Sequence, residues 1–246
     1  MHLKMGIKMT ASYSPNFNLG KRSKKKIKFI IFHYTGMKTE SGAIKKLQDP
    51  KSKVSSHFYI KKNGDILNLV PVSYEAWHAG ISNWKNYKSL NSSSIGIEIT
   101  NPGHQHGYKN FSSKQIISIE KLLKYLIKNY KVDKRFILGH SDISPNRKKD
   151  PGEKFPWQTL AKKKLAWWHS LNLKKIKKFR KVELNSKAEK NKFFKNLHKI
   201  GYNNIKGLST IASNKYLTTA FQRRFRQSLI NGKVDKECYL ISKNLI

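Results

Sequence analysis

Two histidines and one aspartate stand at strand ends or in the loop after one, where a sheet holds side chains rigidly. His33 ends the apolar run 27–32, His140 directly follows the run 136–139, and Asp150 comes ten residues later. Two imidazoles and one carboxylate, with a fourth position open, are a known ligand set of catalytic zinc. Such an ion lowers the pKa of bound water to about 7. The spacing alone fits structural histidines equally well.

Two further charged residues accompany this set. The run 94–100 alternates apolar with small or polar residues, which predicts a strand with its isoleucines on one face and Glu98 on the other. Lys148 comes two residues before Asp150. From residue type alone, Glu98 is also explained as a structural carboxylate paired with a lysine, and Lys148 as one more solvated cation.

The surrounding elements form an α/β pattern. Strands are predicted at 27–32, 56–60, 66–70, 94–100 and 136–138, with a hairpin turn at Asn63-Gly64. Helices are predicted at 41–47 and 157–168, and a long amphipathic helix begins after Ser112, which forms a capping box with Gln115. The fold class predicted is α/β, with a mixed β-sheet flanked by helices.

A shift in composition divides the chain. Residues 171–192 hold eight lysines, one arginine and few apolar residues, and three apolar-periodic stretches follow at 193–200, 216–225 and 239–245. These stretches predict a small C-terminal three-helix domain. We therefore expect an N-terminal extension at 1–23, a catalytic domain at 24–170, a basic linker at 171–190 and the helical domain at 191–246.

The composition excludes some classes of protein and leaves others open. The single cysteine, Cys238, rules out an internal disulfide and any C-x-x-C site. The formal net charge of +37 attracts nucleic acid, anionic lipid or an acidic polymer, although 44 of the 51 cations are lysine and only seven are arginine. No stretch approaches the roughly 20 apolar residues of a membrane span, and no signal peptide is visible.

Five short motifs occur in the order of a known family: Phe32–Gly36, Ala76–Gly80, Ser94–Glu98, Leu138–Asp142 and Lys148–Gly152. Over about residues 24–170 the chain resembles the zinc-dependent N-acetylmuramoyl-L-alanine amidases of the type 2 amidase family, relatives of the peptidoglycan recognition proteins. Residues 191–246 resemble a peptidoglycan-binding three-helix module through the segments 200–202, 220–226 and 232–235.

This resemblance implies a role for each candidate residue. One Zn²⁺ per chain is held by His33, His140 and Asp150, Glu98 is the general base, and Lys148 stabilises the charge that develops on the carbonyl oxygen. The reaction implied is hydrolysis of the amide between the lactyl group of N-acetylmuramic acid and L-alanine. It serves the degradation, remodelling or recycling of the cell wall.

Other polar residues are assigned to substrate or to structure. Tyr34 and Thr35 adjoin His33, and Trp77 and His78 lie in a motif of the family, so all four are expected to contact substrate. Tyr34 and Thr35 are explained equally well as residues that shape a turn. His104 and His106 have the spacing of a metal site, but their loop, rich in Gly and Pro, is more simply the rim of the cleft.

The partners implied are peptidoglycan and muropeptides, and nucleic acid is not expected. A non-catalytic binding protein for wall fragments is one alternative, and a nucleic-acid binder, suggested by the charge and the cluster Arg223, Arg224 and Arg226, is another. A wall-binding module favours the cell envelope, or periplasm, and the lack of a visible signal keeps the cytoplasm open. The lysine-rich surface also suits association with an anionic envelope. The sequence does not indicate an oligomeric state.

Overall fold

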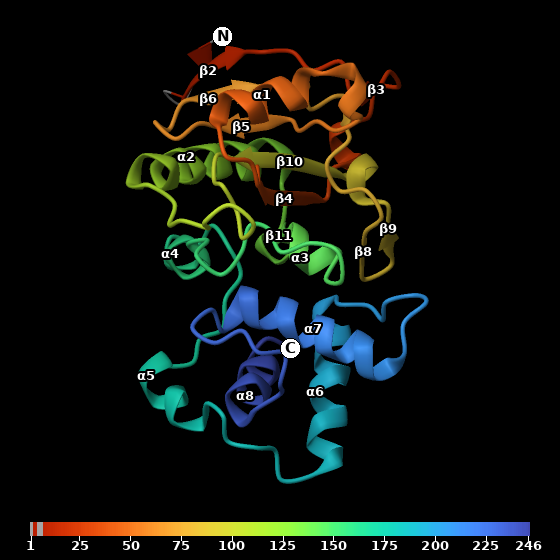
Figure 1. The fold of residues 1–246 in the computed structure, drawn as a ribbon, viewed down its shortest axis with the longest axis vertical. Coiled ribbons are helices and arrows are strands. Elements are labelled where there is room, and N and C mark those ends of the chain that lie inside the picture. The colour runs from red at the N-terminus through yellow and green to blue at the C-terminus, as the bar shows by residue number, and fades with distance from the viewer. Residues whose placement is uncertain (1, 4–6) are drawn as a thin grey trace.

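The structure is a computed structural model that describes residues 2–3 and 7–246 (Figure 1). Its strands are β1 (His2–Leu3), β2 (Ile7–Ala11), β3 (Phe17–Asn18), β4 (Phe29–Tyr34), β5 (Phe58–Ile60), β6 (Ile66–Asn68), β7 (Glu75–Ala76), β8 (Asn83–Trp84), β9 (Tyr87–Lys88), β10 (Ser94–Ile99) and β11 (Ile137–Gly139). The predicted strands at the centre of the chain are thus confirmed, each shortened or shifted by a few residues.

Helices alternate with the strands and then fill the C-terminal third of the chain. They are α1 (Glu40–Gln48), α2 (Ser113–Tyr130), α3 (His140–Ile143), α4 (Trp157–Lys162), α5 (Leu173–Ile176), α6 (Lys187–Ile200), α7 (Thr210–Phe225) and α8 (Lys236–Asn244). The predicted capping box of Ser112 and Gln115 is present. The helix predicted at 157–168 was too long, because Lys164 adopts a positive φ and ends it.

Seven strands form one mixed sheet in the order β1-β2-β6-β5-β10-β4-β11, which confirms the predicted fold class. The central strands β5, β10, β4 and β11 are parallel, and β5 and β6 form the predicted antiparallel hairpin. Carboxyl ends of parallel strands open at the same edge of a sheet. His33, near the end of β4, and His140, just after β11, therefore come to the same edge.

Alternation along β4 and β10 separates two apolar clusters. Ile30 and Phe32 of β4 join the isoleucines of β10 in one cluster, which α2 and α4 cover. Phe29 and Ile31 belong to a second cluster on the opposite face. His33 shares the alternation of Phe29 and Ile31, so its side chain is directed to the second face.

The second cluster continues into the C-terminal helices. Phe29, Ile31 and Leu138 of the sheet belong to the same buried cluster as Phe193 of α6 and Phe221 of α7. Figure 1 shows α7 lying directly beneath α3. The helical region at 191–246 therefore shares a continuous core with the sheet, and its division from residues 24–170 stays a prediction.

Polar contacts cross the same boundary. The Tyr202 hydroxyl donates a hydrogen bond of 2.7 Å to Asp142 of α3. Arg224 of α7 is buried, donates to the carbonyl of Ile137, and places its guanidinium carbon 3.3 Å from the centre of the Trp157 ring. Such stacking is typical of a desolvated guanidinium.

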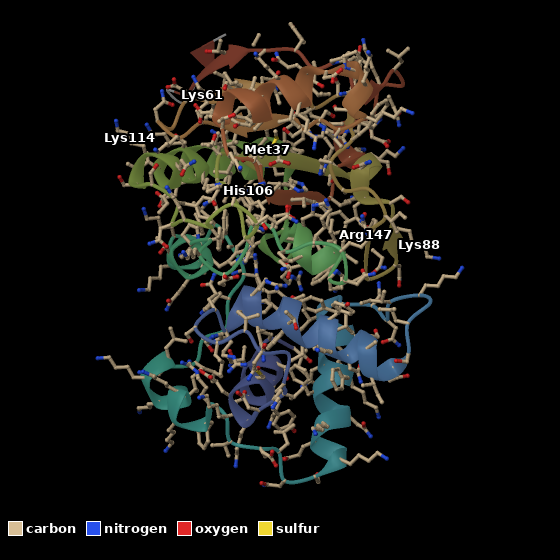
Figure 2. The ribbon with its side chains drawn as sticks, viewed as in Figure 1. Met37, Lys61, Lys88, His106, Lys114 and Arg147 are labelled. Carbon is tan, nitrogen blue, oxygen red and sulfur yellow. The ribbon has the colours of Figure 1, made fainter. Side chains whose placement is uncertain are left out.

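The arginine cluster is thus mostly internal. Arg226 is buried beside Asp235 at 2.9 Å, and Arg224 is enclosed as described. Two of the three arginines that suggested nucleic-acid binding are therefore not available to phosphates. Lysines supply the charged surface: Lys88 and Lys114 are exposed at opposite sides of the molecule (Figure 2).

Both predicted flanking segments pack against other parts of the chain. Residues 7–11, assigned by sequence to the N-terminal extension, form β2 and pair with β6. In the segment predicted as a basic linker, Arg180 pairs with Glu237 at 2.7 Å and the Lys181 amide donates to Asp235. Within the described residues, none of the helices is long and apolar enough to cross a membrane.

Replacing Phe221 with alanine tests the shared core. Phe221 is fully buried and contacts Phe193, Tyr202 and Phe225. We expect Phe221→Ala to lower the free energy of unfolding by about 3–5 kcal/mol, in a single transition followed by near-ultraviolet circular dichroism. Ile211→Ala on the same helix is the control, because Ile211 is 84% exposed. Two separate transitions, with only one of them shifted, would contradict a continuous core.

Candidate functional site

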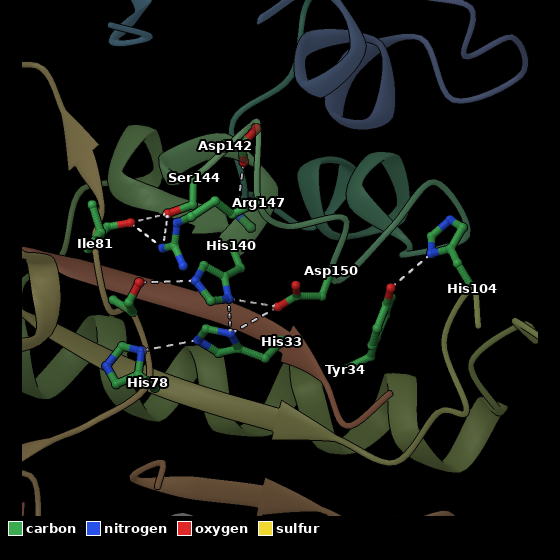
Figure 3. A network of polar contacts seen from close by, with 12 residues as sticks. His33, Tyr34, His78, Ile81, His104, His140, Asp142, Ser144, Arg147 and Asp150 are labelled. Atoms are coloured by element: carbon green, nitrogen blue, oxygen red, sulfur yellow. Dashed lines mark hydrogen bonds and ion pairs between the residues drawn. The ribbon is translucent and has the colours of Figure 1, made fainter. Parts of the chain in front are cut away.

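Two imidazoles and one carboxylate converge at the edge of the sheet (Figure 3). Nδ1 of His33 lies 2.9 Å from Nδ1 of His140, and Oδ2 of Asp150 lies 3.0 Å and 3.1 Å from these nitrogens. All three side chains are buried. Two nitrogens and one oxygen directed to a common point are a donor set suited to zinc. The structure brings together the three residues that the sequence marked as ligands.

The backbone explains how residues 117 positions apart meet. β4 and β11 are parallel neighbours, so His33 and His140 project from adjacent strand ends. The loop after α3 returns Asp150 to the same place, where the Ser141 amide donates to the Asp150 carbonyl at 2.8 Å. Gly139 permits this approach, since a Cβ there would lie 2.6 Å from the Pro151 ring.

His140 is oriented by the backbone. Its Nε2 lies 3.1 Å from the carbonyl oxygen of Ala79, which can only accept a hydrogen bond. Nε2 must therefore carry a hydrogen, which leaves the Nδ1 lone pair of the neutral ring directed at His33 and Asp150. A metal ligand is commonly fixed in this way by a carbonyl on its far nitrogen.

A chain of three hydrogen bonds fixes His33 in the same tautomer. The Ser94 hydroxyl donates to the Leu90 carbonyl at 2.6 Å, so its oxygen accepts from Nε2 of His78 at 3.1 Å. Nδ1 of His78 then accepts from Nε2 of His33 at 3.1 Å. The Nδ1 lone pair of His33 is consequently free for a ligand bond.

Burial favours the neutral forms of His33 and His78. It lowers the pKa of His33 to about 4, with the neighbouring His140 adding to the effect. Burial also places the pKa of His78 well below its ordinary value. For Asp150, burial opposes ionisation, but His140 and His33 outweigh it and hold the pKa below its usual range. Neutral imidazoles beside a carboxylate are the protonation states that metal binding requires.

Glu98 faces the same site. It pairs in register with His33 across β10 and β4, and its side chain lies on the same face of the sheet. Its Oε2 is buried and has no hydrogen-bond partner in the described part of the chain. Burial, followed by the charge of Asp150, raises the pKa of Glu98 to about 8. Such a carboxyl can take up and return a proton near neutral pH.

A cavity of about 350 Å³ opens over these residues, and Lys148 lies in its wall with Glu98 and the three candidate ligands. The four predicted substrate residues also line it: Tyr34, Thr35, Trp77 and His78. Met37 and Arg147, two further lining residues, are labelled in Figure 2. The volume suits a ligand of moderate size.

Several of these residues already form hydrogen bonds within the protein. The Thr35 hydroxyl donates to the Asn101 carbonyl at 3.0 Å, and the Tyr34 hydroxyl lies 2.9 Å from Nδ1 of His104. His78, only 8% exposed, supports His33 from behind. Substrate contact stays a prediction for all four residues.

Sequence reasoning missed the supporting role of His78, although a signal for it exists. Glycine within a strand often marks the close approach of another group. At Gly96 in β10 a Cβ would lie 2.4 Å from the His78 ring. His57 is fully buried and accepts a hydrogen bond from the Gly96 amide at 3.0 Å.

The rim of the cavity is fastened to the loop that follows Asp150. His104 contacts both carboxylate oxygens of Glu153 at 3.1 Å, so its Nε2 donates and its Nδ1 accepts from Tyr34. The ring of Tyr108 stacks on His104. Neither His104 nor His106 belongs to the metal-ligand cluster found among the described residues.

Comparison with known proteins identifies relatives of the whole chain and of its catalytic part. Residues 23–153 match the N-acetylmuramoyl-L-alanine amidase family named Amidase_2. The chain is 33% identical over 233 residues to the N-acetylmuramoyl-L-alanine amidase AmiD of Escherichia coli K12, which covers 90% of this chain and 83% of AmiD. It is 40% identical over 107 residues to the 1,6-anhydro-N-acetylmuramyl-L-alanine amidase AmpD of Haemophilus influenzae, covering 43% of this chain and 56% of AmpD.

Solved structures agree over nearly the full length. Escherichia coli AmiD, in complex with its substrate anhydro-N-acetylmuramic acid-L-Ala-D-γ-Glu-L-Lys, superposes with a TM-score of 0.78 at 30% identity, covering 93% of this chain and 91% of that one. AmpDh3 of Pseudomonas aeruginosa superposes with a TM-score of 0.77 at 27% identity, covering 94% and 95%. The C-terminal helices are thus included in both superpositions.

Gly96→Ala should weaken metal binding at this site. The added methyl group would displace the His78 ring and with it the hydrogen bond that orients His33. Loss of such an outer partner lowers metal affinity by about 10- to 100-fold, measurable by competition with a zinc-binding dye. Gly20→Ala is the control, because no atom lies within 4 Å of a Cβ at Gly20. Unchanged affinity in Gly96→Ala would remove His78 from the support of the site.

Glu98→Gln should stabilise the chelator-treated protein as the pH rises. The pKa of Glu98 is about 8 in the fold, above the value of 4.5 expected when unfolded. Glutamate therefore loses stability between these pH values, whereas glutamine does not titrate. We expect the gain in melting temperature over the unmodified protein to be smallest near pH 4.5, to grow up to pH 8 and then to level off. A difference in melting temperature that does not change with pH would show that the pKa of Glu98 is not raised.

Proposed function

The chain belongs to the N-acetylmuramoyl-L-alanine amidase family, Amidase_2, and from this premise we propose how its residues carry out the reaction. The enzyme hydrolyses the amide bond between the lactyl group of N-acetylmuramic acid and L-alanine. The observation that carries the mechanism is the convergence of His33, His140 and Asp150 beside the unpartnered carboxyl of Glu98.

We assign one Zn²⁺ per chain to His33, His140 and Asp150. Their donor atoms form a His-His-Asp cluster with a cavity on its open side, which is the composition of a catalytic rather than a structural zinc site. When bound, zinc supplies Lewis-acid chemistry that polarises a carbonyl and makes water more acidic. The outward hydrogen bonds of both histidines hold their lone pairs ready for it.

Glu98 and Lys148 carry out the remaining steps in this proposal. The Glu98 carboxylate accepts a proton from the attacking water and returns it to the departing nitrogen of L-alanine, because an amine leaves poorly as an anion. The Lys148 ammonium stabilises the negative charge on the lactyl carbonyl oxygen. A C–O bond forms as the C–N bond breaks, and the products are a free lactyl carboxyl group and a free peptide amine.

We propose anhydro-muropeptides as substrates. AmiD was solved with an anhydro-N-acetylmuramic acid tripeptide and AmpDh3 with an anhydromuramic pentapeptide. The AmpD relatives carry the same sugar in their names. The match covers just over half of the length of those AmpD proteins. Their substrate therefore supports the assignment only for the catalytic part of this chain.

We place the enzyme at the cell envelope. The C-terminal helices resemble a peptidoglycan-binding module, and the formal charge of +37 attracts anionic envelope surfaces. Such attraction is screened by salt. Fractionation of cells should recover the protein with the envelope and release part of it at high ionic strength; recovery in the cytoplasmic fraction at low salt would overturn this assignment.

An assay of peptide release tests the mechanism. Purified protein with an anhydro-muropeptide should release the stem peptide, lose this activity to a chelator and regain it with Zn²⁺, as followed by mass spectrometry. Glu98→Gln should keep zinc and lose about 10²–10⁴ in kcat, and Lys148→Ala about 10²–10³. Lys114→Ala, at an exposed position, is the control. Full turnover in Glu98→Gln would reject the general-base role.

A further inference from the structure

A second cavity, of about 380 Å³, borders the metal cleft on the side of the C-terminal helices. Its wall combines the loop 145–149 with the exposed side of α7, which supplies Lys215, Tyr216, Thr219 and Arg223. Arg147, Lys148 and Lys149 line both cavities, so the loop 145–149 separates the second cavity from the metal cleft. Figure 1 shows why they adjoin: α7 runs beneath α3 and the loop that leaves it.

The charge of this second cavity has one sign. Five of its lining residues are cationic, and none of the described lining residues is acidic: Arg147, Lys148, Lys149, Lys215 and Arg223. Clefts lined by one sign of charge concentrate ligands of the opposite sign. The composition favours an anionic group of small size.

Arg223 is the best placed of these cations. Its side chain is only 12% exposed, and its Nε is buried without a hydrogen-bond partner in residues 2–3 and 7–246. The nearest carboxylate, Glu153, stands 3.8 Å from this nitrogen and already contacts His104 through both oxygens. Because Nε is enclosed, a carboxylate in the cavity has to bind the terminal nitrogens of the guanidinium, which can hold it in a planar, two-pronged geometry.

The substrate carries such carboxylates on one side of the scissile bond only. The lactyl carboxyl is consumed in the amide that is cut, so the sugar offers no free carboxylate. In a stem peptide of the sequence L-Ala-D-γ-Glu-L-Lys, the γ-linkage leaves the α-carboxylate of glutamate free, and the chain ends in a second one. Glutamate is the second residue after the scissile bond, and an extended residue spans about 3.3–3.6 Å. Its free carboxylate therefore lies only about two residue lengths from the bond that is cut in the metal cleft.

We propose that α7 and the loop 145–149 form a carboxylate-binding subsite for the stem peptide, with Arg223 as its specificity-determining residue. The inference rests on the proposed function and extends it: the C-terminal helices contact the substrate that is being cut, in addition to any role in holding the wall. The peptide leaves the metal cleft past Lys148 and Lys149 and places a free carboxylate against Arg223.

Amidated substrates identify the carboxylate. The unmodified enzyme is compared on the muramoyl tripeptide, on its D-isoglutamine form and on its form with a C-terminal amide. We expect the form that lacks the bound carboxylate to have kcat/KM about 10- to 100-fold lower. Because this contact is made equally in the ground and transition states, the change should appear in KM. Equal rates on all three substrates would overturn the proposal.

Variants show whether Arg223 reads that carboxylate. Arg223→Gln should raise KM for the free-carboxylate tripeptide to the value of the amidated one and leave the amidated one unchanged. Lys215→Gln, at an exposed position of α7, should give a smaller change of about 2- to 5-fold, and Lys206→Gln, exposed outside the cavity, none. An equal loss on both substrates in Arg223→Gln would indicate a structural effect and reject the subsite.

Binding without turnover separates this proposal from the proposed function. Calorimetry measures the affinity of the free peptide L-Ala-D-γ-Glu-L-Lys and of its isoglutamine form for the unmodified protein and for Arg223→Gln. We expect the unmodified protein to prefer the carboxylate form and Arg223→Gln to lose that preference, whether or not any substrate is hydrolysed. Equal affinities for the unmodified protein would reject the subsite even if the amidase activity is present.

Discussion

The structure depends on one constraint: two buried imidazoles must direct the same nitrogen, Nδ1, toward one carboxylate oxygen. Nothing in the mutual contact of His33, His140 and Asp150 enforces this, since each ring could flip its tautomer. The tautomer of each ring is fixed by the hydrogen bond on its far nitrogen. For His140 the partner is the Ala79 carbonyl, which can only accept. For His33 the partner is His78, whose own tautomer is fixed by the Ser94 hydroxyl. Outer hydrogen bonds thus decide what the inner donors can bind.

The same constraint explains why the C-terminal helices are packed so closely onto the sheet. His140 begins α3, and Asp142 in that short helix accepts both the Gly139 amide and the Tyr202 hydroxyl. A one-turn helix has little stability of its own. Contacts from Tyr202 and the apolar residues of α6 and α7 hold it in place, so the position of a candidate metal ligand depends on residues far away in the sequence.

Local patterns predicted most of this fold. Strand alternation, the Asn63-Gly64 turn and the capping box at Ser112 each depend only on residues close together in the sequence. Local patterns also marked His33 and His140 as candidates, since both follow apolar runs, but the ligand set itself was implied by the family resemblance. What they could not supply is contact between distant segments. The hydrogen bond from His33 to His78 and the placement of Arg223 in the wall of the second cavity follow from tertiary packing. Gly96 was a visible signal of the first, but only the structure shows which ring it accommodates.

Two carboxyl groups in one cavity acquire opposite properties from their partners. Asp150 lies between two imidazoles that hold its pKa low, while Glu98 has a buried oxygen without a partner among the described residues and a pKa of about 8. Pairs of acids whose surroundings separate their pKa values commonly divide the roles of charged ligand and proton carrier. A surface with a formal charge of +37 does not erase this difference, because only Lys148 and Lys46 act appreciably on Glu98 and burial outweighs both. The chemistry is therefore set by a few buried contacts.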